Sequence, residues 1–193
     1  MVFQFFKNLM ARNGRFGDAL YDDAVVQARR PLFFHTMGVP DTLDGRYDLI
    51  VLHLCLLRFA ILQDGEAPGD GAMLQAMDER FVMDMDHALR EIGVGDLSVG
   101  KQVKKMMGGY QGRWTSYRDA FSNVREGAAR DDLIDVLYRN VYREAEGADA
   151  GLLAQYCAAQ VSHLQDQGAK IRAEQRTPWA PWAVGDAQIS AAS

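Results

Sequence analysis

Two groups of residues in the middle of the chain have spacings that could support chemistry. Residues 95–101 read Gly-Asp-Leu-Ser-Val-Gly-Lys, the Gly-x4-Gly-Lys spacing of a phosphate-binding loop. Such a loop needs a preceding strand, and a Ser or Thr after the lysine to hold magnesium. Here helical spacing precedes the loop, and Gln102 occupies the hydroxyl position. We therefore interpret this stretch as a corner between two helices, with Gly93 ending the first and Asp96 or Ser98 capping the second.

The second group could hold a metal ion. Asp84 and His87 are three residues apart and Glu91 follows one turn later, so all three share a helix flank. Metal sites in helical bundles use two such motifs and further carboxylates, and no second Asp- or Glu-x-x-His occurs in the chain. The simpler interpretation is two side-chain pairs, Arg80 with Asp84 and His87 with Glu91. A metal-dependent helical-bundle enzyme using Asp84, His87 and Glu91 is kept as the alternative hypothesis.

Other polar residues are expected to be structural. Asp78 falls among the apolar positions of its helix, and a buried carboxylate is costly unless it is paired. Arg58 and Arg46, from the preceding helix, are the candidate partners. His53 lies in an apolar helix and is predicted to be a hydrogen-bonded core residue. Cys157 has no histidine at a nucleophile-like spacing, which argues against a thiol enzyme.

Helical periodicity dominates the chain, and strand alternation is nearly absent. The pattern predicts an all-α, single-domain bundle of about six to eight helices, in which the apolar helix ending at Leu62 lies at the centre. Asp41 is predicted to cap that helix, with Asp44 and Asp48 in its first turns, where the helix dipole favours carboxylates. The remaining helices are expected at residues 3–10, 18–29, 72–92, 99–107, 113–125, 131–144 and 149–173, with a break at Gly108-Gly109.

This pattern divides the chain into an N-terminal amphipathic segment (residues 1–15), a helical domain (16–175) and a flexible tail (176–193). The 193 residues are 48% hydrophobic and 24% charged, as in ordinary soluble domains. No signal or transit peptide is recognisable at the N-terminus. The longest apolar run, Leu49 to Leu62, is shorter than the roughly 20 residues of a bilayer span. A cytoplasmic protein, peripheral at most to the inner membrane, is expected.

The charge distribution points to an anionic partner. Residues 101–130 carry seven Lys or Arg against two Asp or Glu, although the whole chain has a net charge of −5. Tyr110, Trp114 and Tyr117 alternate with these cations, a combination that can bind RNA, lipid headgroups or a polypeptide. A solvated helix face with its aromatic residues turned toward the core fits equally well. The acidic remainder argues against DNA and against a large nucleic-acid footprint.

Taken in order, several motifs resemble those of the ubiquinol–cytochrome c chaperone family, whose members assist assembly of the cytochrome bc1 complex. The most specific are Val39-Pro40-Asp41-Thr42 and Gly93-Val94-Gly95-Asp96-Leu97. The resemblance extends from about residue 20 to residue 142, and little beyond residue 145 can be matched. The matching stretches are residues 25–31, 38–54, 81–86, 89–97, 112–113 and 139–142.

The resemblance implies a non-catalytic chaperone that binds newly made, unassembled cytochrome b. Mitochondrial relatives act with a small partner protein near the ribosomal exit tunnel, and a chain without a transit peptide looks like a bacterial member. The ribosomal exit region or an anionic membrane surface is a further possible partner, and no cofactor or metal is expected. The residues expected to line or position the binding surface are Arg46, Tyr47, Asp84, Arg90, Glu91, Asp96, Lys101, Lys104, Arg113 and Tyr117.

Overall fold

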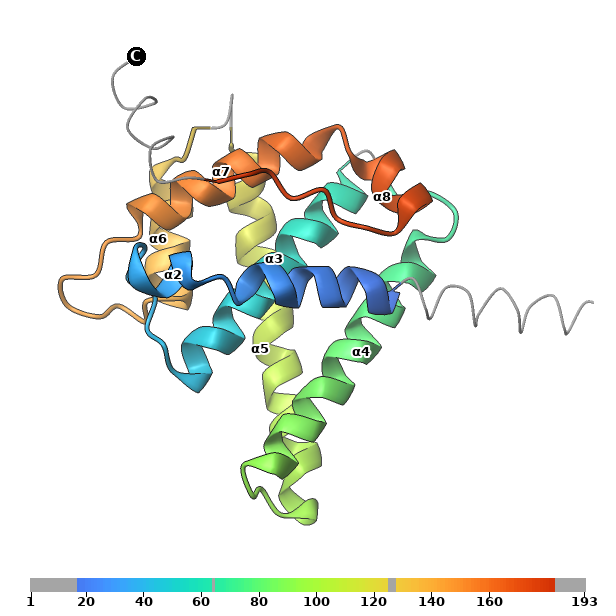
Figure 1. Ribbon diagram of the computed structural model, residues 1–193, viewed down its shortest axis with the longest axis vertical. Helices are drawn as coiled ribbons and strands as arrows, with labels where there is room; N and C mark the ends of the chain where they lie inside the picture. The colour runs from blue at the N-terminus through green and yellow to red at the C-terminus, as the bar shows by residue number, and fades with distance from the viewer. Residues whose placement is uncertain (1–16, 64, 125–127, 183–193) are drawn as a thin grey trace, which may run out of the picture.

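The structure, a computed structural model, describes residues 17–63, 65–124 and 128–182 (Figure 1). Residues 17–28 are helical, and the proposed amphipathic segment at 1–15 lies outside the described residues. The all-α fold class is confirmed. The helices that follow residues 17–28 are α2 (Pro31–His35), α3 (Leu43–Leu62), α4 (Asp70–Glu91), α5 (Asp96–Ser122), α6 (Asp131–Asn140), α7 (Gly151–Gln165) and α8 (Gly168–Glu174).

Helix α3 forms the centre of the bundle, as its apolar sequence predicts. Every residue from Asp48 to Leu57 is buried, and the helix packs against α4, α5, α7 and α8. The cap differs from the prediction, because the Thr42 hydroxyl accepts the Gly45 N–H at 3.1 Å. Asp41 instead pairs with Arg46 at 2.6 Å, which leaves capping to the neighbouring threonine.

Helices α4 and α5 lie side by side and project beyond the other helices; we call this pair the arm and residues 92–97 its tip (Figure 1). Gly93 ends α4 as predicted, with φ +88° and its N–H bonded to the Arg90 carbonyl at 3.0 Å. The predicted break at Gly108-Gly109 is wrong, since α5 is continuous through both residues. Packing of Tyr110 and Tyr117 in the core holds this stretch helical despite its glycines.

The C-terminal part of the described chain packs onto the bundle. The helix predicted at 149–173 is divided into α7 and α8, and residues 175–182 then run back over the fold; we call these residues the strap (Figure 1). The Gln160 side chain exchanges two hydrogen bonds with the Ala180 backbone, at 2.9 and 3.1 Å. Trp179 lies edge-on to His53, with 5.3 Å between ring centroids. The strap is therefore fixed to the domain, unlike the flexible tail expected from residue 176, and residues 183–193 lie outside the described residues.

His53 is a hydrogen-bonded core residue, as predicted. Its Nδ1 lies 2.8 Å from the Leu49 carbonyl oxygen and its Nε2 lies 2.8 Å from the Tyr156 hydroxyl. Burial lowers the pKa of His53 to about 4, so the ring is neutral at physiological pH. No helix in the described part of the chain has both the length and the hydropathy needed to cross a membrane.

Candidate functional site

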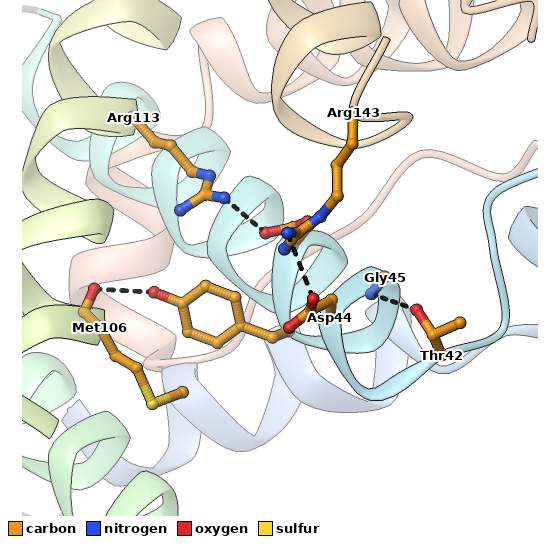
Figure 2. A network of polar contacts seen from close by, with 8 residues as sticks. Thr42, Asp44, Gly45, Met106, Arg113 and Arg143 are labelled. Atoms are coloured by element: carbon orange, nitrogen blue, oxygen red, sulfur yellow. Dashed lines mark hydrogen bonds and ion pairs between the residues drawn. The ribbon is translucent and has the colours of Figure 1, made fainter. Parts of the chain in front are cut away.

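A buried carboxylate lies where the arm joins the rest of the bundle. Asp48 is 0% exposed and one turn along α3 from Asp44. Its Oδ1 lies 2.8 Å from Arg113 Nη2 on α5, and its Oδ2 lies 3.0 Å from Arg143 Nη2 in the turn after α6. Arg143 also contacts Asp44 at 3.2 Å (Figure 2). We call Asp44, Asp48, Arg113 and Arg143 the charge cluster.

The charge cluster connects α3, α5 and the turn after α6. Burial of its charged groups carries a substantial desolvation cost. Burial raises the pKa of Asp48 above its ordinary value, while Arg113 and Arg143 act in the opposite direction. A buried carboxylate that lost an arginine would be left partly uncompensated, which is strongly destabilising. Arg143 has the left-handed φ of 55°, unusual for a residue with a side chain, and its two contacts to Asp48 help to hold it there.

Tyr47 joins the charge cluster to the root of the arm. Its hydroxyl donates to the Met106 carbonyl at 2.8 Å (Figure 2). Its ring stacks on Phe81 of α4, with 5.9 Å between centroids, and the Arg113 guanidinium lies 5.6 Å from the ring centroid. Burial raises the pKa of Tyr47 to about 12, so the hydroxyl stays protonated and available to donate. Tyr117 is fully buried and stacks on Phe121, with 5.7 Å between centroids.

Three of the predicted site residues, Tyr47, Arg113 and Tyr117, therefore position α5 instead of presenting a free surface. All three are predicted site residues, whereas the only role predicted for Asp48 is a favourable interaction with the helix dipole. Its burial between two arginines depends on Arg143, which is far away in the sequence. Helical periodicity gives no signal for such a contact.

A shallow pocket of about 230 Å³ lies between the arm and α3. In its lining Arg58 pairs with Asp78 at 2.6 Å, which confirms one of the two candidate partners of that carboxylate. The other candidate, Arg46, pairs with Asp41 instead. The Arg58 guanidinium lies 5.7 Å from the Tyr110 ring centroid and 5.6 Å from that of Trp114. The pocket lining consists of Arg58, Asp78, Met107, Tyr110, Gln111 and Trp114.

The residues that line this pocket are not among those predicted to form the binding surface, although the sequence contains one signal for it. Met107, Gln111 and Trp114 have the i, i+4, i+7 spacing of one helix face, and Met107 and Trp114 are apolar residues that remain only half-buried. The predicted break at Gly108-Gly109 assigned these residues to different helices. The continuous α5 brings them onto one face beside the partly buried ion pair of Arg58 and Asp78.

The other predicted site residues lie along the arm or at the start of α3. Arg90 bonds Asp86 at 2.6 Å and also bonds Asp96 across the tip. Exposed Lys101 and Lys104 lie on α5 just beyond the tip, and neither forms an ion pair with any residue that the structure describes. Arg46 is exposed in the first turns of α3, beside Asp41.

The structure does not assemble either of the two enzyme sites considered from the sequence. Asp84 lies 3.3 Å from Arg80, and His87 lies 3.1 Å from Glu91, which are the pairs expected from the simpler interpretation. No group of three or more His, Cys, Asp or Glu within the described ranges could hold a metal ion. Residues 96–101 are helical, and their N-cap is Gly95 instead of the predicted Asp96 or Ser98. No phosphate-cradling loop is formed there.

Comparison with known proteins identifies the family of this chain. The family model for the ubiquinol-cytochrome C chaperone matches residues 35–176, and the chain belongs to this family. Among solved structures, the crystal structure of the Cbp3 homolog from Brucella abortus superposes with a TM-score of 0.77 and 28% sequence identity. The match covers 94% of this chain and 97% of that one. A search of curated proteins finds no match.

Proposed function

We propose that this protein is a non-catalytic assembly factor that binds newly made cytochrome b and promotes assembly of the cytochrome bc1 complex. The observation that carries the proposal is the family match over residues 35–176, which includes the charge cluster and the whole arm. The protein would hold an unassembled membrane subunit, whose apolar surfaces and empty haem site are otherwise exposed. This role requires a binding surface and neither a cofactor nor a metal.

The arm is the surface that we assign to the client. Its pocket offers an apolar wall, made by Met107 and Trp114, next to the Arg58–Asp78 ion pair. Such a groove suits a helical or extended segment that presents an apolar side chain and a polar neighbour. The charged residues Arg90, Lys101 and Lys104 lie further along the arm, where they would select the orientation of the client through its charges.

In this proposal the buried residues have a positioning role. The charge cluster fixes α5 to α3, and Tyr47 fixes it through the Met106 carbonyl, so the pocket is preformed instead of assembled on binding. A preformed pocket avoids part of the entropy cost of ordering side chains at an interface. Asp84, Glu91, Asp96 and Arg46 complete the proposed surface as charged residues at its edge.

Site-specific photo-crosslinking in cells tests the proposal. A photoreactive residue replaces Gln111, which lines the pocket and is exposed, in cells that are making the bc1 complex. We expect a covalent adduct that contains cytochrome b, identified by mass spectrometry, with or without ribosomal proteins. The matched control places the same residue at Lys170, which is exposed on α8.

The control position reports on nonspecific capture. An adduct with cytochrome b at position 111 and none at position 170 supports binding at the arm. An equal yield at both positions contradicts the assignment to the arm. The absence of cytochrome b at position 111 and in a pull-down of the whole protein contradicts the proposed function itself.

A further inference from the structure

The tip of the arm exposes large apolar side chains that no element of the described chain covers. Leu97, in the first turn of α5, is 103% exposed, and Ile92, the C-cap residue of α4, is 59% exposed. The two residues lie on either side of the Gly93 turn, at the end of the arm that points away from the bundle (Figure 1).

A band of positive charge follows directly behind the tip. At the 100° per residue of a helix, Leu97, Lys101, Lys104 and Lys105 fall within about 100° of the circumference of α5. All four are exposed, and none of the lysines forms an ion pair within the described part of the chain. At 1.5 Å per residue, the lysines follow Leu97 by roughly 6 to 12 Å along the axis. An apolar end with cations at this depth is the pattern of a segment that enters a lipid interface.

The acidic residues near the tip cancel part of this positive charge and leave a small excess of cations. Asp86 and Asp96 both bond Arg90, and Glu91 lies 3.1 Å from His87. The single charge of Arg90 offsets one of these three carboxylates, and the three lysines outnumber the two negative charges that are left when histidine is counted as neutral. The unpaired cations of the tip region lie on α5, on the same helix face as Leu97.

We propose that the arm tip docks on an anionic lipid surface, with Leu97 and Ile92 entering the headgroup region and Lys101, Lys104 and Lys105 contacting the headgroups. Cations within about a Debye length of a charged bilayer gain attraction that neutral lipids do not provide. The inference does not depend on the identity of the client, since it rests on the tip alone.

Vesicle flotation of the full chain tests the proposal. The probe is a vesicle of phosphatidylcholine with roughly 30% phosphatidylglycerol, compared with phosphatidylcholine alone. We expect flotation with the anionic vesicles only, and loss of binding when salt rises from about 0.1 M to about 0.5 M. Changing Lys101, Lys104 and Lys105 to Gln should weaken partitioning by about fivefold for each lysine.

Matched variants and a second readout separate docking from nonspecific adhesion. Val26→Ser and Lys170→Gln remove an exposed apolar residue and an exposed lysine away from the tip, and both should float as the unchanged protein does. A polarity-sensitive dye on Leu97→Cys, which reacts first because Cys55 and Cys157 are buried, should shift to the blue with anionic vesicles. Failure of the unchanged protein to float, binding of RNA in place of vesicles, or equal loss in the control variants would overturn the proposal.

Discussion

The carboxylate of Asp48 and the guanidinium of Arg113 form an ion pair of 2.8 Å between the buried central helix α3 and helix α5 of the arm. Asp48 is 0% exposed and Arg113 is 19% exposed, so solvent screens the pair little. Arg143 approaches the same carboxylate from the turn after α6. The direction in which the arm leaves the bundle is therefore set by a buried charge.

Removing the Arg113 guanidinium should destabilise the fold, because the buried charge of Asp48 is then less fully compensated. We expect Arg113→Gln to lower the free energy of unfolding by about 3 kcal/mol, because Asp48 keeps only Arg143 as a charged partner. Arg118→Gln, which removes a surface arginine paired with adjacent Asp119 at 2.8 Å, should change it by less than about 0.5 kcal/mol. Urea unfolding of both variants measures the difference, and equal values would show that the cluster adds little to stability.

Charge reversal on the arm should affect assembly without affecting the fold. Lys101→Glu with Lys104→Glu changes only exposed side chains, so we expect unchanged thermal unfolding and a lower level of assembled bc1 complex in cells. Arg113 is left out of this variant because its loss would destabilise the domain and obscure the result. Lys170→Glu on α8 is the control. Normal bc1 levels in the double variant would remove the basic surface from the proposed function.

The pKa of His53 makes stability depend on pH in a defined window. The folded pKa is about 4 and the ordinary value is 6.5, so between these values the unfolded chain binds a proton that the folded chain excludes. Stability should therefore fall as pH decreases through this window, by about 3 kcal/mol from this residue. Urea titrations of the unchanged protein and His53→Gln at several pH values isolate the contribution. Identical pH slopes would contradict it.

Substitution by alanine should change stability in opposite directions at two glycines of the arm. Gly93 has φ +88°, a conformation that costs an alanine about 1 kcal/mol, so Gly93→Ala should be destabilising. Gly100 lies in the exposed interior of α5 with no atom within 4 Å of an added Cβ, so Gly100→Ala should stabilise by about 0.5 to 1 kcal/mol. Thermal unfolding of the two variants gives the signs, and a shared sign would contradict this account.

Local patterns predicted the parts of the structure that depend on local interactions. The burial of α3 follows from an apolar sequence on all sides, the turn at Gly93 follows from glycine chemistry, and the Arg58–Asp78 pair follows from a charge among apolar positions. The continuity of α5 was missed, because glycine's low propensity was overridden by tertiary packing of Tyr110 and Tyr117. The pocket was missed as a consequence of that error.

Contacts between distant segments were beyond prediction from periodicity. In the charge cluster, Arg143 contacts Asp48. In the strap, Ala180 bonds Gln160 and Trp179 packs against His53. The local sequence around each of these residues shows no pattern that would predict the contact. Proline and alanine content made the strap resemble a tail, whereas its tryptophans and backbone hydrogen bonds hold it in place.

The strap also determines when this protein can finish folding during its own synthesis. Asp23, near the start of the described chain, accepts hydrogen bonds from Arg176 and from the Thr177 N–H, both at 2.9 Å. A ribosome makes the chain from its N-terminus, so Asp23 and His53 are synthesised long before the residues that cover them. Part of the surface of the central helix therefore stays uncovered until the strap has been synthesised and has packed against it.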